Sequence, residues 1–220
     1  MLFLGCGSEA APERVGEEQP IVERTVEEDT TAPDAYTDEQ LIGFIRNEYT
    51  AVAGEVTREV LLVDSLEYQC ADPAGQFWVY SDPETEESRL IVNSYSLGDH
   101  YGVTEYWYLS EGEPFFLLRE AGSWRFGGAM TTDDAGNEVP GTIDEITEER
   151  FYVHEGRILR HLRKEYTIES WREIPDPNEV PNVTVEPPGE LPRTLEWVGL
   201  SEEDWTVDCD KIDEVIRQSL

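Results

Sequence analysis

The stretch TEYWYLSEGEPFFLLRE, residues 104–120, decides the fold. Aromatic and branched side chains stand on both sides of a short polar turn, which is the pattern of a β-hairpin. A second stretch, EERFYVHEGRILRHLRKE at residues 148–165, repeats this order. In each copy we predict a strand, a three-residue turn ending in Gly112 or Gly156, and a returning strand, with the glycine in the left-handed position of a bulged turn. Two copies are too few for a solenoid, so they indicate one hairpin unit duplicated within a single sheet.

Further strand-like segments surround this repeat. They are short, rich in β-branched and aromatic residues, and separated by turn-forming sequences such as DPETEES and DDAGNE. The segments include REVLLV, QFWVYS, RLIVNSYS and SWRFGG. Their order predicts an antiparallel meander.

The segment TDEQLIGFIRNEYTAVA, residues 37–53, predicts a helix that precedes the sheet. Thr37 is a suitable N-cap, and Gln40 stands three residues later, as a capping box requires. The apolar residues Leu41, Ile45 and Val52 recur at helical spacing on one face. We expect this face to pack on the sheet.

Alternation along the two hairpins predicts two sheet faces. We assign one face to the core beneath the helix; its members are Trp107, Leu109, Phe115, Leu117, Phe151, Val153 and Leu159. The other, which we call the aromatic face, carries Tyr106, Tyr108, Phe116, Arg150, Tyr152 and Arg160. Tyrosine and arginine are enriched at interfaces, so this face is a possible binding surface. The alternative is that the C-terminal segment covers it, with Trp197 and Trp205 as anchors.

The C-terminal residues 174–220 form an appendage to the domain of residues 37–173. The prolines of IPDPNEVPNVTVEPPGELPR exclude a central strand and predict an extended segment. Asp208 is a suitable cap for a short terminal helix. The predicted fold class is therefore α+β: an N-terminal helix packed on an antiparallel meander, with an extended C-terminal segment and a short terminal helix.

Cys6 indicates a cellular location for the protein. Leu4-Gly5-Cys6 is similar to the end of a bacterial lipobox, in which a small residue precedes the cysteine that receives lipid. We interpret residues 1–6 as the remnant of a signal sequence, although a chance Gly-Cys pair is the alternative. Residues 7–36 are rich in Glu, Pro and Thr and predict a flexible acidic linker. The predicted location is the bacterial cell envelope, periplasmic or at the outer-membrane surface, with the membrane contacted through lipid on Cys6.

The two remaining cysteines fit an oxidising compartment. Cys70 and Cys209 can form a disulfide, and the alternative is a pair of buried free thiols. The sequence contains no Cys-x-x-Cys motif and no His/Cys cluster, so we expect no metal site and no cofactor.

The charge of the chain excludes one class of partner. The formal net charge is −33, from 49 acidic and 16 basic residues. Such a chain lacks the positive surface that nucleic acids require. The composition is typical of salt-adapted proteins and equally of acidic exported proteins.

Four segments together resemble a family. They are GDHYGVTEYWYL, SWRFGG, the stretch DDAGNEVPGTIDEITEERFYVHEGRIL and KEYTIESW. These segments look like uncharacterised exported lipoproteins found mainly in Bacteroidota-type bacteria, in which aromatic hairpins recur and a helix follows the lipidated tether. The resemblance covers residues 37–171 and implies a fold and a cellular location. It implies no activity.

Two functions remain open. The first is a non-enzymatic envelope lipoprotein, a binding or structural module for an envelope protein or glycan. The second is a carboxylate-dependent hydrolase of envelope polysaccharide, with Glu105 and Glu149 as an acid/base pair because they occupy equivalent places in the repeat. We name no catalytic residue for the first. The basic stretch RILRHLRK, residues 157–164, is either an anion-binding stripe or a row of cross-strand partners for glutamates.

Overall fold

The computed structural model describes residues 36–70, 73–192, 194–200 and 205–211. Residues Tyr36–Leu220 form one compact unit. Cys6, the predicted signal remnant and the predicted linker up to residue 35 lie outside the described residues.

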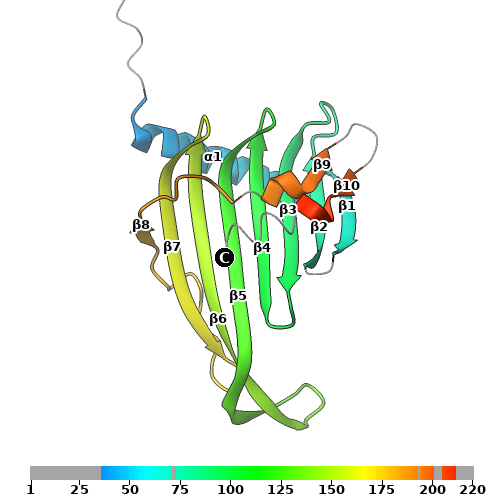
Figure 1. Ribbon diagram of the computed structural model, residues 1–220. Helices are drawn as coiled ribbons and strands as arrows, with labels where there is room; N and C mark the ends of the chain where they lie inside the picture. Colours follow the sequence, from blue (N-terminus) through cyan, green and yellow to red (C-terminus); the bar gives the residue numbers. More distant parts are fainter. Residues whose placement is uncertain (1–35, 71–72, 193, 201–204, 212–220) are drawn as a thin grey trace, which may run out of the picture. The chain divides into compact units, whose positions relative to one another are not determined.

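The described chain is built around one eight-stranded antiparallel sheet (Figure 1). Each strand pairs with the next in sequence, and a separate two-stranded hairpin follows. The elements in chain order are α1 (Asp38–Thr57), β1 (Leu62–Gln69), β2 (Ala74–Ser81), β3 (Ser88–Leu97), β4 (Tyr101–Ser110), β5 (Glu113–Thr132), β6 (Glu138–His154), β7 (Arg157–Glu169), β8 (Val183–Val185), η1 (Thr194–Trp197), β9 (Val198–Leu200) and β10 (Trp205–Val207). The predicted antiparallel sheet is confirmed. The predicted α+β class is wrong, because the described residues are mainly antiparallel strands and α1 is the one α-helix of several turns among them.

Helix α1 begins where its sequence places the N-cap. The backbone N–H of Gln40 donates to Thr37 Oγ1 at 3.3 Å, and the N–H of Thr37 donates to Gln40 Oε1 at 2.9 Å. This reciprocal capping box satisfies two backbone donors that the first turn leaves without partners. The helix extends to Thr57, beyond the predicted end at residue 53.

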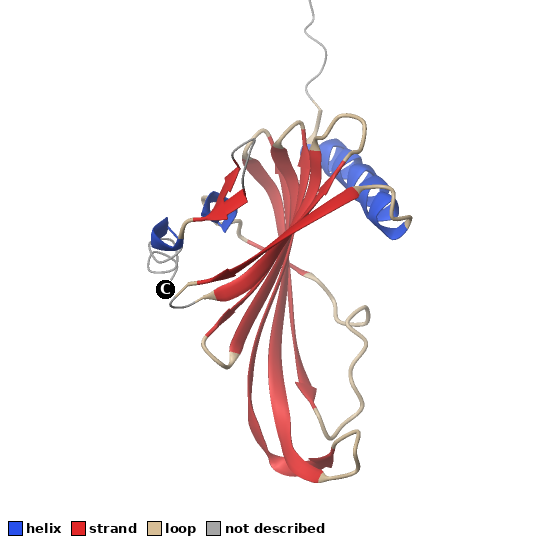
Figure 2. Ribbon diagram, turned by 90° about the vertical axis from the view of Figure 1, so that its right-hand side faces the viewer, coloured by secondary structure: helices blue, strands red, loops and turns tan. Residues whose placement is uncertain are grey.

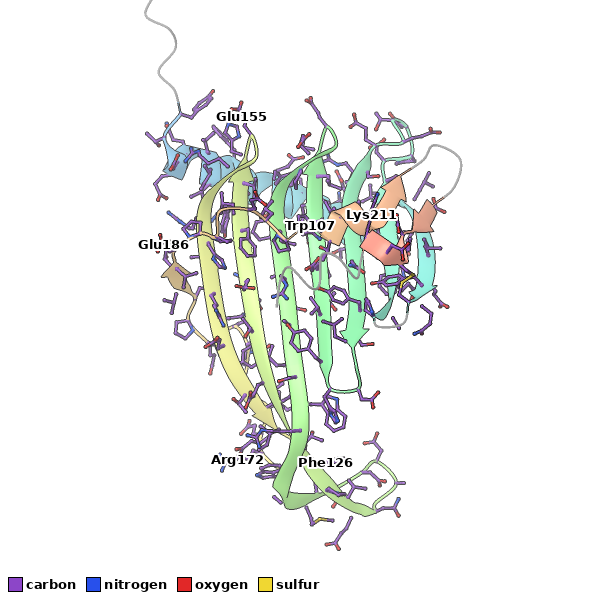
Figure 3. The ribbon with its side chains drawn as sticks, in the orientation of Figure 1. Trp107, Phe126, Glu155, Arg172, Glu186 and Lys211 are labelled. Carbon is purple, nitrogen blue, oxygen red and sulfur yellow. A yellow bond between two sulfur atoms is a disulfide. The ribbon has the colours of Figure 1, made fainter. Side chains whose placement is uncertain are left out.

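The two repeated hairpins close through two-residue turns. Ser110 pairs directly with Glu113, and His154 pairs directly with Arg157. All four turn residues have positive φ: Glu111 at 51°, Gly112 at 80°, Glu155 at 48° and Gly156 at 73°. Positive φ at both central positions defines a type I′ turn, which matches the twist of the flanking strands. The predicted three-residue turn is therefore wrong, while the left-handed glycines are confirmed. Figure 3 shows Glu155 at the tip of the β6–β7 hairpin.

A bulge follows each turn at the same place. In the first hairpin the register shifts after Tyr108, and Phe115 of β5 has no partner in β4. In the second the register shifts after Tyr152, and Leu159 of β7 has no partner in β6. The extra residue interrupts the alternation of its own strand, so it lies on the same face as the residue that follows it. Phe115 and Leu159 therefore pack on the cluster beneath α1 and not with Trp107.

The two sheet faces carry different covers from those predicted. Helix α1 packs on the aromatic face, where Tyr108, Phe116 and Tyr152 form a cluster with helix residues. Trp107 belongs to the opposite face, whose core cluster contacts part of the C-terminal segment. Figure 2 shows α1 on one side of the sheet and the β9–β10 hairpin on the other. Among the described residues, α1 covers the aromatic face, so the predicted open face is not found. The side chains of Trp197 and Trp205, the alternative anchors, lie outside the described ones.

The C-terminal segment belongs to the same compact unit as the sheet. Its proline-rich part supplies the short edge strand β8, which pairs with β7. Beyond it, the C-terminal strap, defined as the described residues from 191 to 211, places Leu191, Leu195 and Val207 against the Trp107 cluster. A disulfide joins Cys70 to Cys209 across 139 residues of sequence, which is the pairing suggested by the cysteine count. Most of the predicted terminal helix lies outside the described residues.

Candidate functional site

A cavity of about 310 Å³ lies between α1 and the sheet. Ligand pockets typically measure about 300–1,000 Å³, so this cavity suits a small molecule. Its walls come from three elements: Arg46, Tyr49 and Thr50 of α1, Phe116 and Leu118 of β5, and Arg150 and Tyr152 of β6. We call it the helix–sheet cavity.

Regular geometry brings these residues together. Arg46, Tyr49 and Thr50 stand at positions i, i+3 and i+4 of α1, and therefore project from one helix face. On the sheet, Phe116 pairs directly with Tyr152, and Leu118 pairs directly with Arg150. Because side chains two residues apart share a face, these four sheet residues form one square patch.

Aromatic rings line the inner part of the cavity. The rings of Phe116 and Tyr152 meet edge to face with centroids 5.1 Å apart. Tyr49 reaches down from the helix to Phe116 at 5.0 Å and to Tyr108 at 4.9 Å. Such edge-to-face pairs hold their rings in place, so this wall is preformed.

The mouth of the cavity carries positive charge. Arg46 and Thr50 are exposed on the helix, and the guanidinium carbon of Arg46 lies 5.6 Å from the centre of the Tyr152 ring. That distance is within the range of a cation–π contact. Arg150 lies on the sheet side and pairs with Glu148 at 2.6 Å. No carboxylate is among the residues that line the cavity.

Half of the predicted binding surface contributes to this cavity. Phe116, Arg150 and Tyr152 line it, whereas Tyr106 and Tyr108 pack on the helix side without lining it. Arg160 forms an ion pair with Glu39 of α1. Tyr152 is only 6% exposed, so the aromatic face is a covered wall with a cavity and not an open surface.

On the opposite face, a row of polar side chains crosses four strands. Asn93, Glu105, Arg119 and Glu149 stand directly opposite one another in β3, β4, β5 and β6. Arg119 lies between two glutamates, with Nη1 3.0 Å from Glu149 Oε2 and Nε 3.4 Å from Glu105 Oε1. We call this row the polar ladder. It contains both glutamates of the acid/base pair that the hydrolase alternative requires.

Glu105 is the most buried member of the polar ladder. Its side chain is fully buried, and its Oε2 accepts hydrogen bonds from the Trp107 indole at 3.1 Å and from the Thr194 hydroxyl. Burial raises the pKa of Glu105 above its ordinary value, although these hydrogen bonds and the charge of Arg119 oppose the shift. Thr194 belongs to the C-terminal strap, which covers this carboxylate.

His161 extends the polar ladder toward β7. Its Nε2 lies 3.1 Å from Glu149 Oε1, and its ring stacks on Phe151 with centroids 4.2 Å apart. Glu149 thus contacts both Arg119 and His161. A carboxylate held on both sides in this way has little freedom to act as a nucleophile or a base on a glycan.

The basic stretch at 157–164 is fully used in ion pairs. Arg157 pairs with Asp38 and Arg160 with Glu39, both in the first turn of α1. Its two remaining bases also pair with glutamates, Arg163 with Glu165 and Lys164 with Glu148. Only the pair of Lys164 with Glu148 joins neighbouring strands as predicted, since Arg157 and Arg160 pair with the helix and Arg163 pairs within β7. These ion pairs leave no free anion-binding stripe there.

The sequence contained a signal for some of these residues and none for others. Glu105 stands two residues before Trp107, Arg119 two after Leu117 and Glu149 two before Phe151, so alternation places all three on the Trp107 face. Arg46 was missed. Its helical position marks it as polar and exposed, and nothing local indicates the cavity beside it.

Comparison with protein-family models, with curated proteins and with solved structures found no match. In the described part of the chain, no helix combines the length and apolar character needed to cross a membrane. Across the same residues, no group of three or more His, Cys, Asp and Glu side chains is placed to hold a metal ion. The functional argument therefore rests on the helix–sheet cavity and the polar ladder.

Proposed function

We propose that this protein is a non-enzymatic binding module that holds a small molecule in the helix–sheet cavity. One observation carries the proposal: a preformed aromatic wall and two arginines surround a space of ligand size. Ligand sites are typically apolar cavities with a few polar groups that fix orientation. The helix–sheet cavity has this composition, with Phe116, Leu118 and Tyr152 as its apolar part.

The same geometry supports binding over hydrolysis. A glycosidase needs two carboxyl groups on either side of the scissile bond. Glu105 and Glu149 have Arg119 between them, and the strap residue Thr194 bonds to Glu105. The helix–sheet cavity, in turn, is lined by no carboxylate. The hydrolase is therefore not favoured.

We also propose that the protein is located in the cell envelope, with Cys6 as the lipidated residue. The disulfide between Cys70 and Cys209 supports export, because such bonds persist in oxidising compartments. In bacteria that export the protein, labelled palmitate should appear in the wild type and not in Cys6→Ser. Label retained by the mutant would refute the anchor.

The cavity itself is tested with a fluorescent probe. N-phenyl-1-naphthylamine is neutral and apolar, and its emission rises when it enters an apolar site. The wild type should bind it, and Thr50→Trp should abolish binding because the new indole fills the space beside Tyr49. Thr57→Trp is the matched control, since Thr50 and Thr57 are both exposed on α1 and each donates to the carbonyl four residues earlier at 2.8 Å. Binding that survives Thr50→Trp would show that the cavity is not the site.

A further inference from the structure

Arg46 is a cation without an acidic partner in an acidic protein. The chain has 49 acidic and 16 basic residues, yet no carboxylate of a described residue lies within ion-pair distance of Arg46. Its counterparts Arg157 and Arg160, which face α1 from the sheet, are both paired with helix carboxylates. A guanidinium at a cavity mouth with no anion beside it is suited to bind an anionic group of a ligand.

The other cations near the cavity have carboxylate partners. Arg150 pairs with Glu148, and Glu148 also pairs with Lys164 at 2.8 Å. Glu120 stands directly opposite Glu148 on β5. Arg150 and Lys164 thus share the carboxylate of Glu148, whereas Arg46 has no carboxylate partner among the described residues.

The apolar wall and the volume define the rest of the ligand. Phe116, Tyr152 and Leu118 form a floor that favours a flat or branched apolar body. A space of about 310 Å³ excludes a polymer. The net charge of −33 repels ligands with several negative charges before they reach the mouth.

Resting on the proposed function, we infer that the helix–sheet cavity binds a small organic monoanion. The anionic group, a carboxylate, sulfonate or phosphate diester, lies on Arg46. The apolar body lies over Phe116 and Tyr152, beneath Tyr49. This assigns Arg46 as the residue that selects ligands by charge.

A pair of probes separates charge from shape. The probe 1-anilinonaphthalene-8-sulfonate has the same aromatic body as N-phenyl-1-naphthylamine and adds one sulfonate. Arg46→Gln should weaken binding of the sulfonate probe by roughly tenfold or more, because the sulfonate loses a charge-assisted hydrogen bond from the guanidinium. The neutral probe, which has no group for the guanidinium to pair with, should lose much less affinity. Arg46→Lys should recover part of the lost affinity.

Arg125→Gln is the matched control for loss of one arginine. Arg125 is exposed on β5 and forms a long ion pair with Glu145 at 3.6 Å, outside the residues that line the cavity. It should change neither affinity.

The outcomes separate the inference from the proposed function. Equal weakening of both probes by Arg46→Gln would overturn the charge role, and so would unchanged binding of the sulfonate probe. In either case the proposed cavity stands if Thr50→Trp still abolishes binding of the neutral probe. If the wild type binds neither probe, or if Thr50→Trp binds as the wild type does, the proposed function itself fails.

Discussion

Glu105 and Arg119 stand directly opposite each other in β4 and β5, and their side chains make an ion pair inside the sheet core. Glu105 Oε1 accepts no hydrogen bond of good geometry from the described residues. Its interaction with Arg119 Nε, at 3.4 Å, is an ion pair. Buried charges are costly unless they are paired and hydrogen-bonded. The polar ladder is therefore a place where pH and mutation have large effects.

We predict that Glu105 makes the protein less stable as pH rises. Its folded pKa lies above the ordinary value of 4.5, so the folded state holds this proton more tightly than the unfolded state. The contribution is fully present below pH 4.5 and is lost as pH rises through the folded pKa. Glu105→Gln keeps an oxygen that accepts the hydrogen bonds from Trp107 and Thr194, but its amide does not titrate. Urea unfolding at pH 5 and pH 8 should show a smaller loss of stability for the variant than for the wild type.

The control for this experiment is Glu84→Gln, which removes a carboxylate from an exposed turn. Its pH profile should parallel that of the wild type. Glu105→Leu should cost about 3–5 kcal/mol at either pH, because Arg119 loses one of its buried partners and Trp107 loses its acceptor. Parallel pH profiles for Glu105→Gln and the wild type would contradict the buried, proton-holding carboxylate.

The contents of the polar ladder follow from strand alternation. A strict period of two places Glu105 with Trp107 and Glu149 with Phe151, and the structure has them on those faces. Alternation does not predict which element covers each face, because helix α1 and the C-terminal strap both have apolar residues that can pack on a sheet. The helix was therefore assigned to the wrong side, even though its start at the capping box was predicted to the residue.

We predict that the disulfide holds the C-terminal strap on the sheet. Closing a loop of 139 residues constrains the unfolded chain and typically contributes about 2–5 kcal/mol. The double variant Cys70→Ser, Cys209→Ser should lose this amount in denaturant unfolding. Amide exchange should quicken first at Val207 and Thr194, since apolar packing alone then retains the strap.

Wild-type protein treated with reductant is the matched control and should behave as the double variant does. Alkylation of non-reduced, exported protein should label neither Cys70 nor Cys209. Equal unfolding free energies with and without the bond would show that the strap is held by packing.

Trp171 occupies a slot that two glycines leave open at the far end of β5 and β6, near Phe126 and Arg172 in Figure 3. A Cβ at Gly127 would lie 2.2 Å from the Trp171 ring, and one at Gly141 would lie 2.4 Å from it. Gly127→Ala should therefore displace the indole and cost about 1–3 kcal/mol, measured by denaturant unfolding. Gly128→Ala is the neighbouring control, because nothing lies within 4 Å of its added Cβ. Equal stability of the two variants would argue against the slot.

The bulges at Phe115 and Leu159 mark the limit of the sequence argument. Nothing in PFF or ILR indicates that one residue will lack a cross-strand partner. The same residues can form either a two-residue turn followed by a bulge or a three-residue turn ending in glycine. The two arrangements place the first side chains of the returning strand on opposite faces of the sheet. The choice depends on packing against α1, where Phe115 and Phe116 both contact the helix cluster. The helix–sheet cavity depends on that same packing and on Arg46, which is remote in sequence from the strands.

The last prediction concerns the turns themselves. Glu111 and Glu155 both occupy left-handed backbone positions, at φ 51° and 48°, directly before a glycine. A glutamate there is strained by its Cβ, whereas asparagine tolerates this conformation and Asn-Gly is the preferred type I′ pair. Glu111→Asn and Glu155→Asn should each stabilise the protein by about 0.5–1 kcal/mol, measured as a higher denaturant midpoint with an unchanged slope. Glu84→Asn removes the same charge at a turn residue outside the positive-φ set and should change stability by less than about 0.5 kcal/mol. A gain in the control equal to that at the hairpin tips would assign the effect to the lost charge, in a chain of net charge −33, and not to the turn geometry.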